Sequence, residues 1–226
     1  MGRKIGEVFE LDGVKYVQKG DDVEQPTYVI RSMDNFGKVR WLDEYMAGHR
    51  GFICGGCFKN ILNGDVVKDI DIFFESPNDF QYAVDYYNDQ SDWKFKYRND
   101  KACAFQREGE KTWIELIESE FGTPEEILRS FDFTVTKMAY LKQKSDDDGI
   151  EYTLLHHVDF FEHLHQKRLV CDENIPFPVS TWERTYRYGK YGYNMCRETK
   201  KKLIESLKSI DLDSEPISMY NTGGWD

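Results

Sequence analysis

Two aspartates separated by one residue, in Lys68-Asp69-Ile70-Asp71-Ile72, are the residues with the clearest chemical potential. On a β-strand, residues two apart point to the same face, so Asp69 and Asp71 would place two carboxylates side by side. Hard oxygen ligands of this kind suit Mg²⁺. The pattern therefore predicts a magnesium site, and the plainer alternative is a pair of exposed acids on a strand.

A glycine pair, Gly55-Gly56, precedes the aspartates and a short polar and apolar stretch. Because glycine has no Cβ, backbone N–H groups at such a turn can approach a phosphate closely, and the start of a following helix favours negative charge. Lys59, in the first turn of that predicted helix, would add a positive charge. Cys54 and Cys57 bracket the glycines as in a thioredoxin-like redox pair, but we expect them to be small buried residues.

The elements that must position these residues form an α+β pattern. A strand, a glycine turn, a short helix and an acidic strand follow one another from residue 51 to residue 74, and strands are predicted at 94–98, 103–107, 113–117 and 135–141. From residue 158 onward the spacing is mostly helical, with a Ser180–Glu183 capping box. We expect a β-hairpin extension over 1–34 that turns at Asp12-Gly13, a head over 35–150, a helical neck over 151–213 and a loose tail over 214–226.

The combination of Gly55-Gly56, a helix and Lys68-Asp69-Ile70-Asp71-Ile72 resembles the polymerase β type of nucleotidyltransferase. It is most similar to the signature of CCA-adding tRNA nucleotidyltransferases and bacterial poly(A) polymerases, except that Lys59 and Asn60 stand where that signature has Arg and Asp. The resemblance implies a polymerase β-like head with a mixed sheet, followed by a small helical neck. It also implies an NTP substrate and two Mg²⁺ ions.

Two further stretches carry the resemblance, which covers roughly residues 50–205. Phe131-Asp132-Phe133-Thr134 is similar to a family motif that places Asp132 near the nucleotide sugar, although two arginines of that motif are Ser130 and Phe131 here. Glu183-Arg184-Thr185-Tyr186-Arg187 resembles the neck helix, where Arg184 and Arg187 share a face and would contact the nucleotide. The acidic motif that templates the incoming base is absent, so the resemblance supports nucleotidyl transfer rather than ordered CCA addition.

A third carboxylate is expected in this superfamily on a neighbouring strand, where it would help to hold the metal and orient the attacking hydroxyl. Glu115 is the best candidate because it is an acid flanked by apolar residues in Trp113-Ile114-Glu115-Leu116-Ile117. The alternative is an exposed acid on an edge strand.

Composition limits the partners. The chain has 30 Lys+Arg against 41 Asp+Glu, a net charge of −11, so its whole surface cannot act as a polycation and we expect no stable DNA binding. Arginine and tyrosine alternate over residues 184–193, which suits phosphate contact and base stacking with a nucleotide or RNA. No apolar run is long enough to span a membrane, the start lacks a signal peptide, and the five scattered cysteines indicate reduced thiols, so we expect a cytoplasmic protein.

These observations together predict a metal-dependent nucleotidyltransferase that uses Asp69, Asp71 and Glu115. It would move an NMP from an NTP to an acceptor hydroxyl. The predicted acceptor is an RNA 3′ end, with tRNA favoured by the resemblance. Nucleotidylation of a protein or small molecule, and a noncatalytic nucleotide- or RNA-binding protein that keeps the fold, are the alternatives.

Overall fold

The structure is a computed structural model that describes residues 8–11, 14–19, 22–24, 27–32, 36–144, 150–171 and 175–210. The turn predicted at Asp12-Gly13 and the tail predicted over 214–226 lie outside these residues. The chain divides into two compact units. Unit 1 comprises Met1–Phe131 and Thr136–Phe160, and unit 2 comprises Asp132–Val135 and Phe161–Asp226.

The first strands of unit 1 form a small antiparallel sheet of β1 (Val8–Leu11), β2 (Val14–Lys19) and β3 (Asp22–Glu24). Val8 pairs with Val17 and Leu11 pairs with Val14. Strands β1 and β2 therefore pair as the predicted N-terminal hairpin requires.

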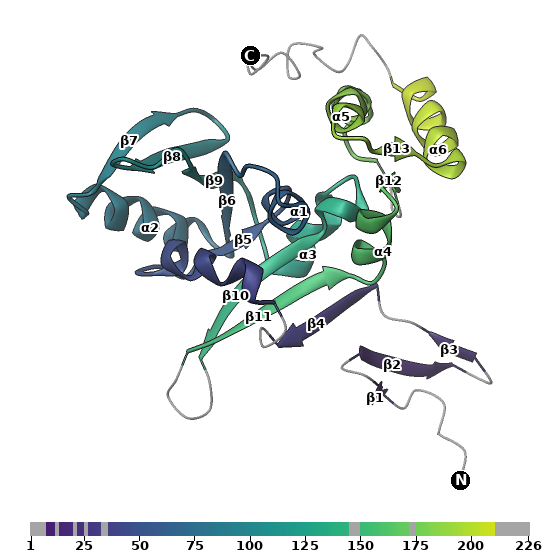
Figure 1. The fold of residues 1–226 in the computed structure, drawn as a ribbon, viewed down its shortest axis with the longest axis horizontal. Helices are drawn as coiled ribbons and strands as arrows, with labels where there is room; N and C mark the ends of the chain where they lie inside the picture. Colours follow the sequence, from purple (N-terminus) through teal and green to yellow (C-terminus); the bar gives the residue numbers. More distant parts are fainter. Residues whose placement is uncertain are drawn as a thin grey trace. The chain divides into compact units, whose positions relative to one another are not determined.

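The centre of unit 1 is an eight-stranded mixed sheet in the order β4-β11-β10-β5-β6-β9-β8-β7 (Figure 1). Strands β6 and β9 run parallel, and every other neighbouring pair is antiparallel. The strands are β4 (Tyr28–Ser32), β5 (Phe52–Cys54), β6 (Asp69–Phe74), β7 (Trp93–Arg98), β8 (Ala102–Arg107), β9 (Trp113–Phe121), β10 (Met138–Lys144) and β11 (Ile150–His157).

The helical segments of unit 1 begin where the sequence supplies caps. Helix α2 (Pro77–Asp89) starts after Ser76, whose hydroxyl accepts from the Asp79 N–H, and it packs against β6 and β9. Helix α3 (Pro124–Ser130) starts with Pro124 in its first turn and a capping box between Thr123 and Glu126. Residues Gly37–Met46 form a 3₁₀-helix, η2.

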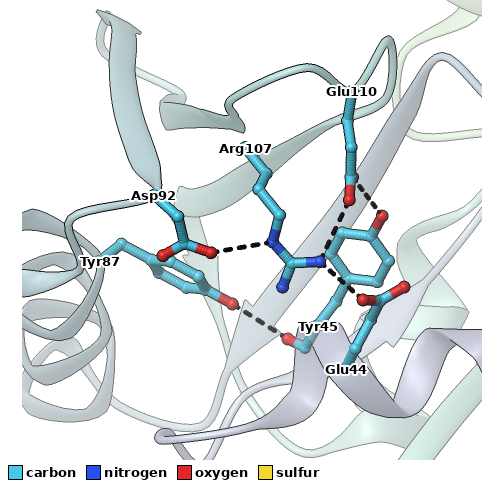
Figure 2. Close-up of polar contacts among 6 residues, drawn as sticks. All are labelled: Glu44, Tyr45, Tyr87, Asp92, Arg107 and Glu110. Atoms are coloured by element: carbon cyan, nitrogen blue, oxygen red, sulfur yellow. Dashed lines mark hydrogen bonds and ion pairs between the residues drawn. The ribbon is translucent and has the colours of Figure 1, made fainter.

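A charged cluster ties η2 to the β7–β8 end of the sheet, and Figure 2 shows it around Arg107. The Arg107 guanidinium donates to Glu44 over 2.6 Å and to Glu110 over 3.1 Å, and it pairs with Asp92 at 3.3 Å. The Tyr45 hydroxyl donates to Glu110, and the Tyr87 hydroxyl donates to the Tyr45 carbonyl. One cation thus links acids from three separate segments of unit 1.

Unit 2 is built around α5 (Pro178–Lys190) and α6 (Arg197–Lys208), which contact each other. Short strands β12 (Arg168–Leu169) and β13 (Asn194–Met195) pair in parallel. The segment Asp132–Val135 belongs to this unit because the Thr134 N–H donates to the Val170 carbonyl and the Phe133 ring packs edge-on against Tyr188.

Several sequence predictions for the later part of the chain are wrong in detail. The helical spacing predicted from residue 158 onward gives only a short first helix, α4 (Phe160–His165), because Lys167 adopts a positive φ of 54° and the next two residues pair as β12. Helix α5 starts at Pro178 without a side-chain cap, so Ser180 lies inside its first turn and forms no capping box. Strand β10 starts at Met138, after the 3₁₀ turn η3 (Thr134–Thr136).

The predicted boundary near residue 150 falls before β11, whereas the division between the units falls after it, at Phe160. The reason is that β11 pairs with β10 along its whole length, from Met138–His156 to Lys144–Ile150. None of the helices among the described residues is long and apolar enough to cross a membrane.

Candidate active site

The turn after β5 brings the backbone close to a carboxylate. Gly55 has a φ of +98°, a conformation that glycine adopts without steric cost, and its N–H donates to the Met138 carbonyl over 3.1 Å. A Cβ at Gly55 would lie 3.5 Å from Oδ2 of Asp71. Gly56 then caps α1 (Cys57–Asn63). The glycine pair of the sequence motif is therefore a turn that passes beside Asp71.

The two aspartates share one face of β6, as the sequence predicts. Ile70 and Ile72 are fully buried on the other face, whereas Asp69 is exposed and Asp71 is half-buried. This alternation leaves both carboxylates on the side of the sheet that the glycine turn approaches.

Glu115 lies directly across from Asp71 on the neighbouring parallel strand. The register of β6 and β9 pairs Asp71 with Glu115 and Asp69 with Trp113, and paired residues point to the same face of a sheet. The structure thus brings Gly55, Asp69, Asp71 and Glu115 together, from three adjacent strands.

Two side chains that the sequence did not single out hold Glu115. The Tyr97 hydroxyl donates to Oε1 of Glu115 over 2.5 Å, and the Trp113 indole N–H donates to the same oxygen over 3.0 Å. Tyr97 stands on β7, two strands away from Glu115, and no spacing rule in the sequence connects them.

The negative charge of this face shifts the pKa values of neighbouring groups. Burial, the hydrogen bond to Glu115 and the charges of Asp69 and Asp71 raise the pKa of Tyr97. Burial and then the charges of Asp71 and Asp69 raise the pKa of the Cys57 thiol well above its ordinary value. A thiol with a raised pKa is protonated at neutral pH, which argues against a reactive redox pair at Cys54 and Cys57.

Carboxylate oxygens are ligands that suit Mg²⁺. These carboxylates lie on one face of two adjacent strands. As the side chains stand, no three His, Cys, Asp or Glu groups among the described residues are close enough together to hold an ion. Asp69 and Asp71 are the pair that would hold one, and Glu115 is turned toward Tyr97 and Trp113.

Lys59 lies on α1 and is buried, with 4% of its surface exposed. Its ammonium group donates to the side-chain oxygen of Asn60, and the Asn60 amide donates in turn to the Val66 carbonyl. The two residues that replace the Arg and Asp of the family signature thus contact each other.

In unit 2 the structure brings Asp132 and Arg184 together. The buried Asp132 carboxylate accepts from Arg184 over 2.7 Å and from the Thr181 hydroxyl over 3.1 Å. Burial disfavours the charge on Arg184, but the carboxylate more than offsets this, so the pKa of Arg184 is raised. Arg187 is exposed, with its guanidinium 6.0 Å from the Tyr188 ring centroid.

Comparison with known sequences identifies a family for this chain. Residues 32–167 match the sequence profile of the family described as "Gabija anti-defense 2 family protein". A curated protein of Bacillus phage SPbetaL7, "Gabija anti-defense 2", is 26% identical over 185 residues, which cover 81% of this chain and 44% of that protein. The chain therefore spans less than half the length of this relative.

Comparison with solved structures identifies the fold. A CCA-adding enzyme in complex with CTP superposes with a TM-score of 0.60 at 16% identity, covering 79% of this chain and 45% of that enzyme. The Thermotoga maritima CCA-adding enzyme complexed with tRNA gives a TM-score of 0.57 at 16% identity, covering 79% and 46%. The predicted α+β fold, a polymerase β-like head with a helical neck, is confirmed.

Proposed function

The chain belongs to the Gabija anti-defense 2 family and has the fold of the CCA-adding enzymes, and on this basis we propose that it is a metal-dependent nucleotidyltransferase. It would move an NMP from an NTP to an acceptor hydroxyl and release pyrophosphate. The observation that carries the proposal is the carboxylate face on which Asp71 lies opposite Glu115, with Asp69 two residues away on β6.

Asp69 and Asp71 would hold Mg²⁺, with Glu115 as the third acid. Bound there, two Mg²⁺ ions would neutralise charge on the attacking and leaving oxygens of an in-line displacement. Glu115 would accept or orient the proton of the acceptor hydroxyl. Gly55 and Gly56 would let the backbone approach the triphosphate, and Lys59 would add positive charge once its ammonium turns from Asn60.

The arginines of unit 2 suit a role in nucleotide binding. Asp132 holds one nitrogen of Arg184, and 40% of the Arg184 side chain remains exposed, so its other N–H groups are available to phosphate oxygens. Arg187 is exposed on the same helix. We assign Asp132 the role of orienting Arg184 in addition to the sugar contact that the resemblance implies.

An RNA 3′ end is the acceptor favoured by the surface of unit 2. Tyr188 is buried, but four other aromatic side chains between residues 177 and 191 are exposed: Phe177 55%, Trp182 40%, Tyr186 59% and Tyr191 51%. Exposed rings beside Arg187 and Lys190 suit base stacking with phosphate contact. A CCA-adding enzyme with this fold is complexed with tRNA, which makes tRNA the first acceptor to test.

Nucleotidylation of a protein is the second candidate, and the family favours it. The phage relative is named for action against a defence called Gabija. Transfer of an NMP onto a hydroxyl of a component of that defence would be one chemical means of countering it. The same carboxylate face would carry this reaction, so only the acceptor differs.

The test is transfer from each of four α-labelled NTPs, with Mg²⁺ and with total RNA, tRNA and the proteins of the Gabija defence as acceptors. We expect label in RNA with the wild-type chain and none with Asp71→Asn. Asp89→Asn, which changes an exposed acid at the end of α2, is the matched control and should keep full activity. Label in protein would favour the second candidate, and NTP binding without any transfer would favour a noncatalytic binding protein.

A further inference from the structure

The carboxylate of Glu115 is anchored through one of its two oxygens. Both donors, the Tyr97 hydroxyl and the Trp113 indole N–H, reach Oε1. Among the residues that the structure describes, no hydrogen bond reaches Oε2. A carboxylate fixed by one oxygen, with the other open, is arranged to offer that second oxygen to a ligand.

The sheet explains how Tyr97 reaches so far. Tyr97, Ala104, Glu115 and Asp71 form one row across β7, β8, β9 and β6. Tyr97 and Glu115 are separated by two strand spacings, about 10 Å, and the residue between them is a fully buried alanine. Because Ala104 is small, the phenol ring and the glutamate side chain can meet above it.

A β-bulge in β7 sets the position of this hydroxyl. The register of β7 and β8 shifts between Phe95 and Tyr97, so Lys96 is the extra residue. The Lys96 ammonium lies 4.0 Å from the centroid of the Trp113 ring, a cation–π contact that restrains the indole. The bulge thus supplies both the donor to Glu115 and a restraint on the second donor.

We propose that Tyr97 and Trp113 are positioning residues that hold Oε1 of Glu115 and leave Oε2 to approach a divalent ion bound at Asp69 and Asp71, a movement that the present spacing of the three carboxylates still requires. This inference rests on the proposed function, because it needs a metal at the carboxylate face. Hydrogen-bonding partners of a ligating carboxylate typically change metal affinity 10- to 100-fold when they are removed.

The test is a Mg²⁺ titration followed by the indole N–H resonance of Trp113 in ¹H–¹⁵N spectra, assigned by its loss in Trp113→Phe. We expect the resonance to move with Mg²⁺ in the wild-type chain, and the half-saturating Mg²⁺ concentration to rise about 10-fold in Tyr97→Phe. Tyr82→Phe removes the hydroxyl of an exposed tyrosine on α2 and should leave the midpoint unchanged. Because Trp113→Phe lacks the indole N–H, its metal affinity is measured by the loss of the free Mn²⁺ signal in electron paramagnetic resonance. This variant should bind Mn²⁺ more weakly than the wild-type chain does.

The outcomes separate this inference from the proposed function. An unchanged or lower Mg²⁺ midpoint in Tyr97→Phe, with Asp71→Asn abolishing the response, would overturn the positioning role and leave the metal site intact. A wild-type chain that shows neither a Trp113 response nor Mn²⁺ binding would overturn both. A rise in the midpoint in Tyr97→Phe, but not in Tyr82→Phe, supports the inference because a general loss of structure would not be specific to one hydroxyl.

Discussion

At the scale of single residues, Asp71 and Glu115 place like charges directly opposite each other on neighbouring strands. Such pairs destabilise a sheet by about 0.2–1 kcal/mol. We therefore predict that Asp71→Asn abolishes Mg²⁺-dependent transfer yet raises the free energy of unfolding by up to about 1 kcal/mol in the presence of a chelator. Urea denaturation measures this change, with Asp89→Asn as the control. A clearly destabilised Asp71→Asn protein would contradict the prediction.

Two buried histidines make stability depend on pH. Burial lowers the pKa of His49 to about 4, and its Nδ1 accepts a backbone N–H from Gly51, so a proton there would cost that bond. Burial likewise lowers the pKa of His156 to about 4. Since an unfolded histidine titrates near 6.5, the unfolded state binds more protons between pH 6.5 and pH 4.

Unfolding free energy should therefore fall as the pH drops through this window, by about 2 kcal/mol for each histidine between pH 7 and pH 4.5. Denaturation midpoints measured at several pH values test the slope. His49→Gln should remove about half of the part of this pH slope that the two histidines contribute. This holds even if the substitution itself changes the stability at pH 7. A slope that stays the same in this variant would show that His49 does not titrate differently in the two states.

The buried Asp132 depends on Arg184 for most of its compensation. Arg184→Met would leave this carboxylate, 5% exposed, with the Thr181 hydroxyl as the remaining donor among the residues that the structure describes. We expect a loss of about 1–2 kcal/mol, less than for a fully buried pair because the arginine side is partly solvated. Thermal unfolding measures the loss, and Arg187→Met on the exposed face should change stability by less than about 0.5 kcal/mol.

At the scale of elements, the sequence predicts those whose signals are local. The alternation of Asp69, Ile70, Asp71 and Ile72 indicates directly which side of β6 is buried. The sequence predicts Glu115 as the third acid because an acid flanked by apolar residues on a strand has one open face. The pairing of β6 with β9, which sets Glu115 against Asp71, depends on tertiary contacts that spacing does not encode.

What the sequence did not predict are features that arise from pairing between distant segments. Tyr97 reaches Glu115 because of a bulge in β7 and a small residue in β8. The helical spacing predicted from residue 158 onward is interrupted because Arg168 and Leu169 pair with Asn194 and Met195, and α6 starts only after this pairing, at Arg197. In each case a long-range backbone ladder overrides a local periodicity.

The Arg107 cluster joins η2 to β8 and to the turn between α2 and β7, and it should control the stability of this end of the sheet (Figure 2). Arg107→Met would leave Glu44, Asp92 and Glu110 close together without their shared cation. We predict a loss of about 2–3 kcal/mol, since the arginine side chain is 24% exposed and stacks on the Trp93 ring. Urea denaturation measures the loss, which should shrink in 1 M salt because salt screens the remaining repulsion.

At the scale of the whole molecule, a chain of net charge −11 is proposed to bind an RNA. A negative net charge is compatible with RNA binding if the RNA contacts a small part of the surface and if base stacking contributes more to the affinity than charge does. The exposed aromatic side chains at 177–191 fit that requirement, because base stacking on an aromatic ring contributes about 1–3 kcal/mol per base and tolerates any sequence.

This balance gives a quantitative prediction for tRNA binding. Two phosphate contacts, from Arg187 and Lys190, would give a slope of about −1.4 in a plot of log Kobs against log salt concentration, far shallower than for a basic RNA-binding protein. Trp182→Ala and Tyr186→Ala should each weaken tRNA binding about 10-fold or more without changing that slope, whereas Arg187→Gln should reduce the slope by about 0.7. Fluorescence anisotropy with labelled tRNA measures both quantities. Tyr82→Ala, which removes an exposed tyrosine from unit 1, is the control. If this variant weakens tRNA binding as much as Trp182→Ala does, tRNA contacts exposed aromatic residues without preference and the acceptor surface does not lie on α5.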